Sequence, residues 1–180
     1  SAVRSVDRAA LQAHDNRRDA GWVRRCHGDL HLGNVVEIDG APVIFDCIEF
    51  NENIACIDVL YDLAFLLMDL SFREGETALL ANRALNAYFD HIAEADIDDM
   101  IGGLPLVPLF VAVRAVVGAK VTAMQVEQGG DAKLRERARA FFDFAMTSFE
   151  TGKPGWSPLA VCPAPANQPW RRCWRPVSDA

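Results

Sequence analysis

Positive charge and phosphate-binding residues are scarce in this sequence. Only three of the 180 residues are lysines, at positions 120, 133 and 153, and no cluster of glycines precedes Gly21. With 18 Lys and Arg residues against 25 Asp and Glu residues, the formal net charge is −7. Nucleic-acid binding depends on Lys and Arg side chains that neutralise phosphates, so the sequence argues against a nucleic-acid partner. The same acidic balance is compatible with a cationic substrate.

Disulfide and membrane signals are also missing. No C-x-x-C pair occurs and the number of cysteines is odd, which is typical of reduced thiols in a cytoplasmic protein. No apolar stretch follows a basic segment near residue 1, so no secretory signal is predicted. The longest apolar stretch, residues 104–117, is interrupted by Arg114 and is too short to span a bilayer. The five cysteines are Cys26, Cys47, Cys56, Cys162 and Cys173.

A β-hairpin is the clearest secondary-structure signal that is present. Hydrophobic residues make up 51% of the chain, enough to build a core. Residues 22–26 favour a short extended segment. Two β-branched runs, residues 34–38 and 42–45, are separated by Asp39-Gly40. A two-residue Asp-Gly loop favours a type I′ turn because both residues tolerate φ > 0.

Helical periodicity accounts for most of the remaining chain. Residues 3–19 predict one helix, and residues 56–69, 74–94 and 104–128 predict three more. The helix over residues 104–128 is apolar nearly all round, as expected of a helix buried between neighbours. A last helix begins after Asp131, a predicted N-cap. The fold class predicted is therefore α+β and mainly helical. The side chains expected to be buried on the last helix are Leu134, Ala138, Phe141, Phe142, Ala145 and Phe149.

The densest group of polar residues lies between the first helix and the hairpin. In the segment Cys-His-Gly-Asp-Leu-His-Leu-Gly-Asn, Asp29 and Asn34 are five residues apart, and Asp46 follows the second strand of the hairpin. Phosphoryl transfer needs one carboxylate to receive or orient the hydroxyl proton and two oxygen ligands to hold magnesium. Protein kinases use an Asp and an Asn at the same spacing, followed by a metal-binding Asp. The pattern predicts a phosphoryl-transfer site.

This pattern resembles the aminoglycoside phosphotransferase and choline-kinase-like family of small-molecule kinases. The resemblance rests on His27-Gly-Asp-Leu-His-x-Gly-Asn34, on Asp46, and on Asp58-x-x-x-Asp62. It is strong over residues 24–69 and extends to about residue 150 in pattern only. It implies the large, C-terminal lobe of a protein-kinase-like fold. It also implies a kinase that transfers the γ-phosphate of ATP or GTP to a hydroxyl of a small molecule, with Mg²⁺ as cofactor.

The resemblance also implies residue roles. Asp29 would be the catalytic base, with His27 and His31 beside it as further catalytic candidates. Asn34 and Asp46 would bind magnesium and, through it, the nucleotide. Gly28, Gly33 and one of the helix carboxylates, Asp58 or Asp62, would support the loop. The alternative for the two carboxylates is a solvated helix face, since charged residues at this spacing are often simply exposed.

Two other functions remain open from the sequence. A metal-dependent hydrolase could use His27, Asp29 and His31 as alternating zinc ligands, with Cys26 nearby. That alternative leaves the placement of Asn34 and Asp46 unexplained. A non-catalytic, kinase-like binding module is the second alternative, because a complete kinase has a glycine-rich loop and a strand lysine over the phosphates.

The predicted domain organisation follows from these missing parts. Residues 1–150 are expected to form the catalytic lobe without the lobe that cradles the nucleotide, as in a fragment. Residues 151–180 contain six of the nine prolines and three of the four tryptophans, without periodicity. We expect this chain by itself to bind ATP poorly and to transfer phosphate slowly or not at all.

A frame shift is one hypothesis for residues 151–180. If each codon's third base is read with the first two bases of the next codon, residues 160–170 permit Gly-Leu-Ser-Gly-Thr-Gly-Lys-Ser-Thr-Leu. That string satisfies G-x-x-x-x-G-K-[ST], the loop that cradles phosphates in P-loop kinases. The segment would then be the remnant of a second, P-loop domain. The alternative is an irregular, proline-rich tail.

Overall fold

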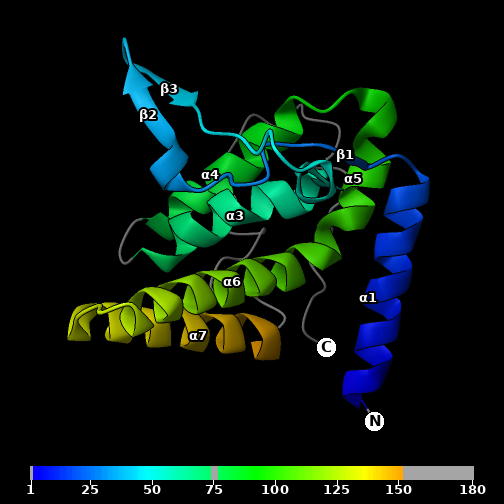
Figure 1. Ribbon diagram of the computed structural model, residues 1–180. Helices are drawn as coiled ribbons and strands as arrows, with labels where there is room; N and C mark the ends of the chain where they lie inside the picture. Colours follow the sequence, from blue (N-terminus) through cyan, green and yellow to red (C-terminus); the bar gives the residue numbers. More distant parts are fainter. Residues whose placement is uncertain (1, 74–76, 152–180) are drawn as a thin grey trace.

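The computed structural model describes residues 2–73 and 77–151, and within them the chain is mainly helical with two small antiparallel sheets (Figure 1). The fold is therefore α+β, as predicted. Residues 152–180, on which the frame-shift hypothesis depends, lie outside the described residues.

The first sheet joins the segment before the polar loop to a segment thirty residues later. Helix α1 (Ala2–Asp19) leads into strand β1 (Val23–Arg25), which pairs with strand β4 (Cys56–Asp58). A short helix α2 (Glu52–Ala55) precedes β4, and helix α3 (Val59–Phe72) follows it. The prediction of a helix from residue 56 was wrong by three residues. Backbone pairing with β1 draws residues 56–58 into a strand, which sequence periodicity cannot show.

The second sheet is the predicted hairpin. Strand β2 (Val35–Ile38) pairs with β3 (Ala41–Ile44), and Figure 1 shows them standing away from the helices. The connecting residues have positive φ angles, 53° at Asp39 and 78° at Gly40. Positive φ at both central residues is the signature of a type I′ turn, so this prediction is confirmed.

The helical body packs around α3. Helix α4 (Thr77–Asp90) and helix α6 (Val107–Glu127) pack against it, and α7 (Ala132–Thr151) runs alongside α6 (Figure 1). A short helix α5 (Ile97–Gly103) lies before α6, between 3₁₀ turns at Glu94–Asp96 and Leu104–Leu106. The predicted N-cap of α7 is confirmed, because the side chain of Asp131 accepts a hydrogen bond from Leu134 N. The most deeply buried large side chains include Leu60, Leu67, Met68, Met100, Val107 and Val111.

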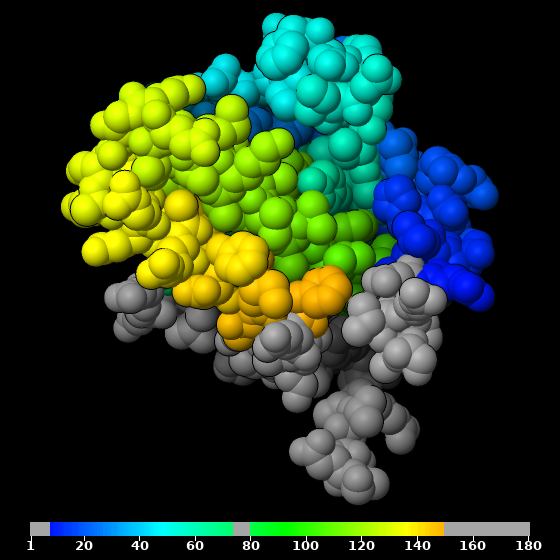
Figure 2. All heavy atoms as spheres, turned by 60° about the horizontal axis from the view of Figure 1, so that its bottom comes forward, coloured from blue at the N-terminus to red at the C-terminus, as the bar shows by residue number. Residues whose placement is uncertain are grey.

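Burial on α6 and α7 differs from the sequence prediction. Phe141 and Ala145 are buried on α7, but Phe142 and Phe149 are each about half exposed. Figure 2 shows the outer surface of α7, in yellow to orange, open to view. Helix α6 is also exposed along one side, which differs from the prediction of a helix buried between its neighbours. The apolar side chains exposed on α6 are Val113, Val116, Val117, Val121 and Met124.

The apolar helical run around α6 is longer than the sequence suggested. Among the described residues, helical structure runs from Glu94 to Glu127, and by length and composition alone this run could cross a membrane. Half of its most apolar window is buried within the fold, and the core helix of a soluble protein would satisfy the same criterion. The run is therefore weak evidence for a membrane span.

Candidate active site

The polar loop of residues 26–34 is fixed at both ends by backbone hydrogen bonds. Cys26 N donates to Ala55 O at 2.8 Å, and Ile48 N donates to His27 O at 2.9 Å. At the far end, Phe45 N donates to Asn34 O at 3.0 Å, which joins the loop to the end of the hairpin. The segment after β3 therefore runs beside the loop. Asp46 is consequently held near Asn34, although the two residues are twelve positions apart.

Buried carboxylates of α3 hold the backbone of the loop. Asp62 accepts hydrogen bonds from the N–H groups of His27 (3.1 Å) and Gly28 (2.9 Å). Two helical turns further along α3, Asp69 accepts a hydrogen bond from Leu32 N at 3.0 Å. Both side chains are buried, so this helix face is not solvated. Each bond satisfies a loop N–H that would otherwise be unpaired in the interior. The role of Asp69 was not identified from the sequence.

Gly28 occupies a position that suits glycine for two reasons. Its φ is +84°, in the left-handed region that side chains disfavour. A Cβ atom built on it would lie 2.9 Å from the Cδ1 atom of Ile48. Ile48 is held close to Gly28 because its backbone N–H donates to His27 O.

The side chains of Asn34 and His31 both approach the carboxylate of Asp29. Asn34 Nδ2 donates to the backbone oxygen of Asp29 at 3.0 Å and to its Oδ2 at 3.2 Å. His31 Nε2 lies 3.4 Å from the same Oδ2, and His31 Nδ1 accepts from Gly33 N at 2.9 Å. The side chain of Asp29 is still 43% exposed, so a small molecule can reach it. Asn34 is buried beneath it.

The other two candidates lie at the edge of this group. His27 Nε2 is 2.8 Å from Phe45 O, a contact that places the proton on Nε2 because a carbonyl only accepts. Its Nδ1 is buried and has no hydrogen-bond partner within the described residues. Asp46, the residue after Phe45, is exposed and has a φ of +60°. A non-glycine residue in this region is uncommon and is enriched at functional sites.

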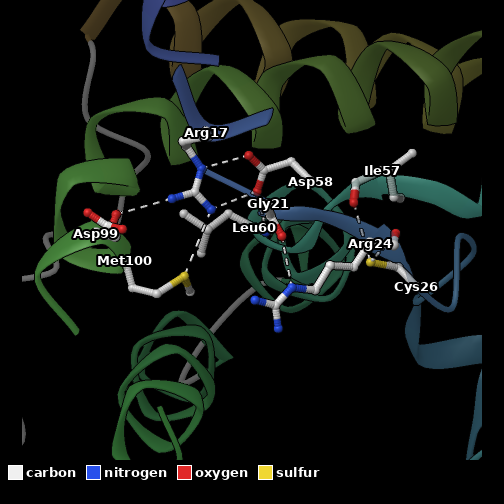
Figure 3. A network of polar contacts seen from close by, with 9 residues as sticks. All are labelled: Arg17, Gly21, Arg24, Cys26, Ile57, Asp58, Leu60, Asp99 and Met100. Carbon is white, nitrogen blue, oxygen red and sulfur yellow. Dashed lines mark hydrogen bonds and ion pairs between the residues drawn. The ribbon is translucent and has the colours of Figure 1, made fainter. Parts of the chain in front are cut away.

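Asp58 takes a different place from Asp62. Its Oδ1 accepts from Leu60 N at 2.8 Å, which caps the start of α3. Both of its carboxylate oxygens also accept from Arg17, at 2.6 and 2.9 Å, as Figure 3 shows. A further Arg17 nitrogen donates to the backbone oxygen of Asp99. Asp58 therefore joins α1 to the start of α3, and Arg17 extends this link to α5.

Arg114 is a second arginine that the sequence did not single out. Its guanidinium lies over the ring of Tyr61, 4.0 Å from the centroid, and 4.7 Å from that of Phe65. It donates to the backbone oxygens of Tyr61 and Gly28, both at 3.3 Å. Burial lowers the pKa of Arg114, opposed by the negative charge of nearby groups that include Asp62 and Asp29. In the sequence this residue was only the interruption of an apolar stretch.

The zinc-site alternative is not supported by this geometry. No group of three His, Cys, Asp or Glu side chains within residues 2–73 and 77–151 is arranged to hold a metal ion. The ring of His27 is bonded to Phe45 O, and that of His31 is oriented by Gly33 N. Burial and the neighbouring charge of Asp62 raise the pKa of the Cys26 thiol to about 11, which disfavours the thiolate that binds metals.

A large apolar cavity lies on another part of the molecule. It has a volume of about 940 Å³ and lies between α1, α6 and the end of α7. None of the residues 27–34 lines it, so it is separate from the candidate active site. Its lining includes Leu11, His14, Tyr61, Leu109, Val113 and Phe149.

Comparison with known proteins identifies the family. The family model described as the phosphotransferase enzyme family matches residues 2–98, more than half of the chain, including the polar loop, the hairpin and α3. The chain belongs to the phosphotransferase enzyme family. Membership in this family implies a protein-kinase-like fold, and the helical body with its small sheets is consistent with one. No solved structure matches the chain.

Curated relatives of this family member come from mycobacteria. Uncharacterized proteins of Mycobacterium tuberculosis, strains H37Rv and CDC 1551, and of Mycobacterium bovis are each 32% identical to it over 111 residues. The match covers 57% of this chain but 19% of each relative. The chain thus spans about a fifth of the length of these relatives.

Proposed function

We propose that this chain carries the transfer chemistry of a small-molecule kinase, which moves the γ-phosphate of ATP or GTP to a hydroxyl group. The observation that carries the proposal is the arrangement around Asp29. Its carboxylate is exposed on one side, is held by Asn34 on the other, and lies on a loop whose backbone is bonded to Asp62 and Asp69. A positioned base beside a magnesium-binding amide is what phosphoryl transfer requires of the protein.

Asp29 is assigned as the base. Asn34 and His31 both approach Oδ2, so Oδ1 is the oxygen assigned to receive the substrate's hydroxyl proton. The exposed side of the carboxylate is where a hydroxyl would approach. Because a positioned base contributes about 10²–10⁴-fold to such reactions, Asp29 is expected to be the most sensitive residue of the site.

His31 is assigned the role of holding Asp29 in place. Its Nδ1 accepts the Gly33 N–H, so the ring proton is on Nε2 and faces Asp29 Oδ2. The ring also packs against Phe65, with centroids 5.3 Å apart. A ring N–H directed at this carboxylate would fix its rotamer. His27, whose Nε2 is bonded to Phe45 O, is assigned to orient the segment that carries Asp46.

Asn34 and Asp46 fit magnesium. Mg²⁺ binds oxygen atoms, takes only one or two protein ligands, and completes its shell with water and phosphates. Asn34 donates from Nδ2 to Asp29, which directs its amide oxygen away from the base. Asp46 is exposed at the end of the hairpin and supplies a carboxylate. When bound, the ion would neutralise charge on the transferred phosphate. With only two side-chain ligands, these residues alone would hold it weakly.

The nucleotide needs contacts beyond these. Two of the three lysines, Lys120 and Lys133, belong to α6 and α7, and neither is part of the loop. We therefore propose that this chain corresponds to the large lobe of the kinase-like fold, and that the phosphate-cradling residues belong to a separate lobe of a longer protein. The substrate would be a small hydroxylated molecule, and the acidic balance of the sequence is compatible with a cationic one. The proposed location is the cytoplasm.

The test uses this chain with Mn²⁺ as a paramagnetic substitute for Mg²⁺. In the presence of ATP, Mn²⁺ is expected to broaden the amide NMR signals of Asn34 and Asp46 before all others. Asn34→Ala and Asp46→Asn should remove the broadening. Asp39→Asn, which changes a carboxylate at the hairpin tip and keeps a residue that tolerates positive φ, is the control. Broadening elsewhere, with these two signals unaffected, would contradict the metal assignment.

Transfer itself is tested with labelled ATP and a panel of amino sugars, choline-like amines and simple sugars. Any transfer by the wild-type chain should fall at least about 10²-fold in Asp29→Asn, while broadening by Mn²⁺ persists. Transfer that is unchanged in Asp29→Asn would overturn the assignment of the base. In a longer protein that includes the phosphate-cradling lobe, metal and nucleotide binding without transfer to any acceptor would favour the non-catalytic binding module.

A further inference from the structure

Arg114 connects the middle of α6 with the candidate catalytic loop. The residue is buried, although its charge interrupts the most apolar helical run within residues 2–73 and 77–151. Its Nη2 donates to Gly28 O, a residue 86 positions earlier, and its Nε donates to Tyr61 O. A buried guanidinium is costly to desolvate unless its donors are used, so a position of this kind calls for a specific reason.

Gly28 is held from both sides because of this contact. Its N–H donates to Asp62 Oδ1 at 2.9 Å, and its carbonyl oxygen accepts from Arg114 Nη2 at 3.3 Å. That carbonyl belongs to the same peptide group as the nitrogen of Asp29. With φ at +84°, Gly28 has fewer steric limits than other residues, and its two flanking peptide groups could rotate. The two hydrogen bonds remove that freedom and fix where the backbone of Asp29 begins.

Arg114 also reaches the other side of the loop through aromatic rings. Its guanidinium lies over Tyr61 and Phe65, at 4.0 and 4.7 Å from their centroids. Phe65 in turn contacts the ring of His31. Arg114 therefore contacts the loop on both sides of Asp29. It contacts Gly28 directly and His31 through Phe65.

The charge of Arg114 matters as well as its shape. Asp29 in the loop and Asp62 on α3 both act on it electrostatically, and residues 26–34 contain no lysine or arginine. A buried cation below the loop offsets the repulsion between these carboxylates. A lysine would keep the charge but could not bond two carbonyls and lie flat on two rings, since those contacts need a planar fork.

We propose that Arg114 is a positioning residue for phosphoryl transfer, which sets the orientation of the Gly28–Asp29 peptide and so the place of the base. This inference rests on the proposed function. Arg114 is not assigned a contact with substrate or nucleotide. It acts through Gly28 and through the Phe65–His31 ring pair.

Three variants separate this role from a general packing role. Arg114→Gln removes the charge, the fork and most of the ring contact, and Arg114→Lys keeps only the charge. Arg137→Gln is the matched control, because Arg137 also lies over an aromatic ring, that of Phe141 at 5.5 Å, but on α7. Amide hydrogen exchange of Gly28 and of the core residue Leu67 is measured by NMR for each variant, with urea unfolding and, for any accepted substrate, kcat and KM.

In Arg114→Gln the exchange of the Gly28 amide is expected to accelerate about tenfold relative to that of Leu67, because the local opening of the loop becomes easier. The kcat should fall about 10²-fold with little change in KM, since a misplaced base affects the reaction and not binding. Arg114→Lys should recover part of the kcat. Arg137→Gln should leave both measurements as in the wild-type chain.

Two results would overturn the proposal. One is equal acceleration of Gly28 and Leu67, which would mean that Arg114 only stabilises the fold. The other is unchanged exchange at Gly28 in Arg114→Gln. Failure of the proposed function has a different signature: selective acceleration at Gly28 would leave the Arg114–Gly28 coupling in place, while absence of transfer to any acceptor by a longer protein that includes the phosphate-cradling lobe would remove the kinase assignment.

Discussion

The guanidinium of Arg17 binds both carboxylate oxygens of Asp58, at 2.6 and 2.9 Å, across 41 residues of sequence. Both side chains are almost fully buried. The pair joins α1 to the start of α3, the helix whose carboxylates hold the candidate catalytic loop. Figure 3 shows Arg17 also reaching the backbone of Asp99 and the sulfur of Met100 on α5. One ion pair thus anchors three helices behind the loop.

Removal of Arg17 is expected to be strongly destabilising. In Arg17→Met the carboxylate of Asp58 stays buried without its partner, which costs about 3–5 kcal/mol of unfolding free energy. The control is Arg18→Met, because Arg18 pairs with Asp15 on the exposed side of α1 and such pairs contribute about 0–1 kcal/mol. Urea unfolding measures both. Similar losses in the two variants would show that the buried pair has no special role.

Asp62→Ala is expected to release the loop from α3. The change leaves the N–H groups of His27 and Gly28 without their shared acceptor, and hydrogen bonds to a charged group contribute about 1.5–3 kcal/mol each. Both amides should exchange faster, and the unfolding free energy should fall by at least about 2 kcal/mol. Asp131→Ala, which removes an exposed N-cap, should cost about 1 kcal/mol and leave the loop amides unchanged. A loop that exchanges normally in Asp62→Ala would contradict the prediction.

Gly28→Ala and Gly21→Ala form a matched pair. Both glycines have a φ near +80°, so each substitution introduces the strain of a left-handed residue, about 1–2 kcal/mol. Only at Gly28 does the new Cβ meet another side chain, the Cδ1 of Ile48 at 2.9 Å, whereas nothing lies within 4 Å at Gly21. The unfolding free energy of Gly28→Ala should therefore be lower than that of Gly21→Ala by about 1–3 kcal/mol. Equal unfolding midpoints would mean that residue 48 moves aside without cost.

Cys26 is expected to react slowly with alkylating reagents. Burial and the charge of Asp62 raise its pKa from 9.0 to about 11, so at pH 8 the thiolate is scarce. Exposed Cys47 provides the comparison within the same protein. Mass spectrometry after limited iodoacetamide treatment should show modification of Cys47 first. Preferential modification of Cys26 would contradict its environment.

The same pKa shift predicts a pH dependence of stability. A thiol whose pKa is higher in the folded chain binds its proton more tightly there than in the unfolded chain. The resulting stabilisation is complete below about pH 9 and is lost as the pH rises through about 11. Cys26→Ala removes this dependence, so the wild-type and variant unfolding midpoints should converge or cross over that interval. If the unfolding midpoints of the two proteins changed in parallel between about pH 8.5 and about pH 11, the prediction would be contradicted.

Local signals in the sequence were sufficient for several elements. Asp39-Gly40 predicts its turn because the required φ angles are a property of these two residues alone. Asp131 predicts the start of α7 for a similar reason, since a cap acts within three residues. The same kind of signal failed at residues 56–58, where a partner strand 31 to 35 residues earlier decides the structure. It also failed at Phe142 and Phe149, because periodicity does not show how much of an apolar helix face its neighbours cover.

The sequence by itself determined the family, the order of helix, loop and hairpin, and the spacing of Asp29, Asn34 and Asp46. Each of these depends on residue type and on short distances along the chain. Only the tertiary structure decided what holds the loop: Asp69 bonds to Leu32 across 37 residues, Arg17 to Asp58 across 41, and Arg114 to Gly28 across 86. Such contacts form where helices pack, and the sequence alone is compatible with many different pairings of its charged residues. Burial then selects the pairs that leave no charge unpartnered in the interior.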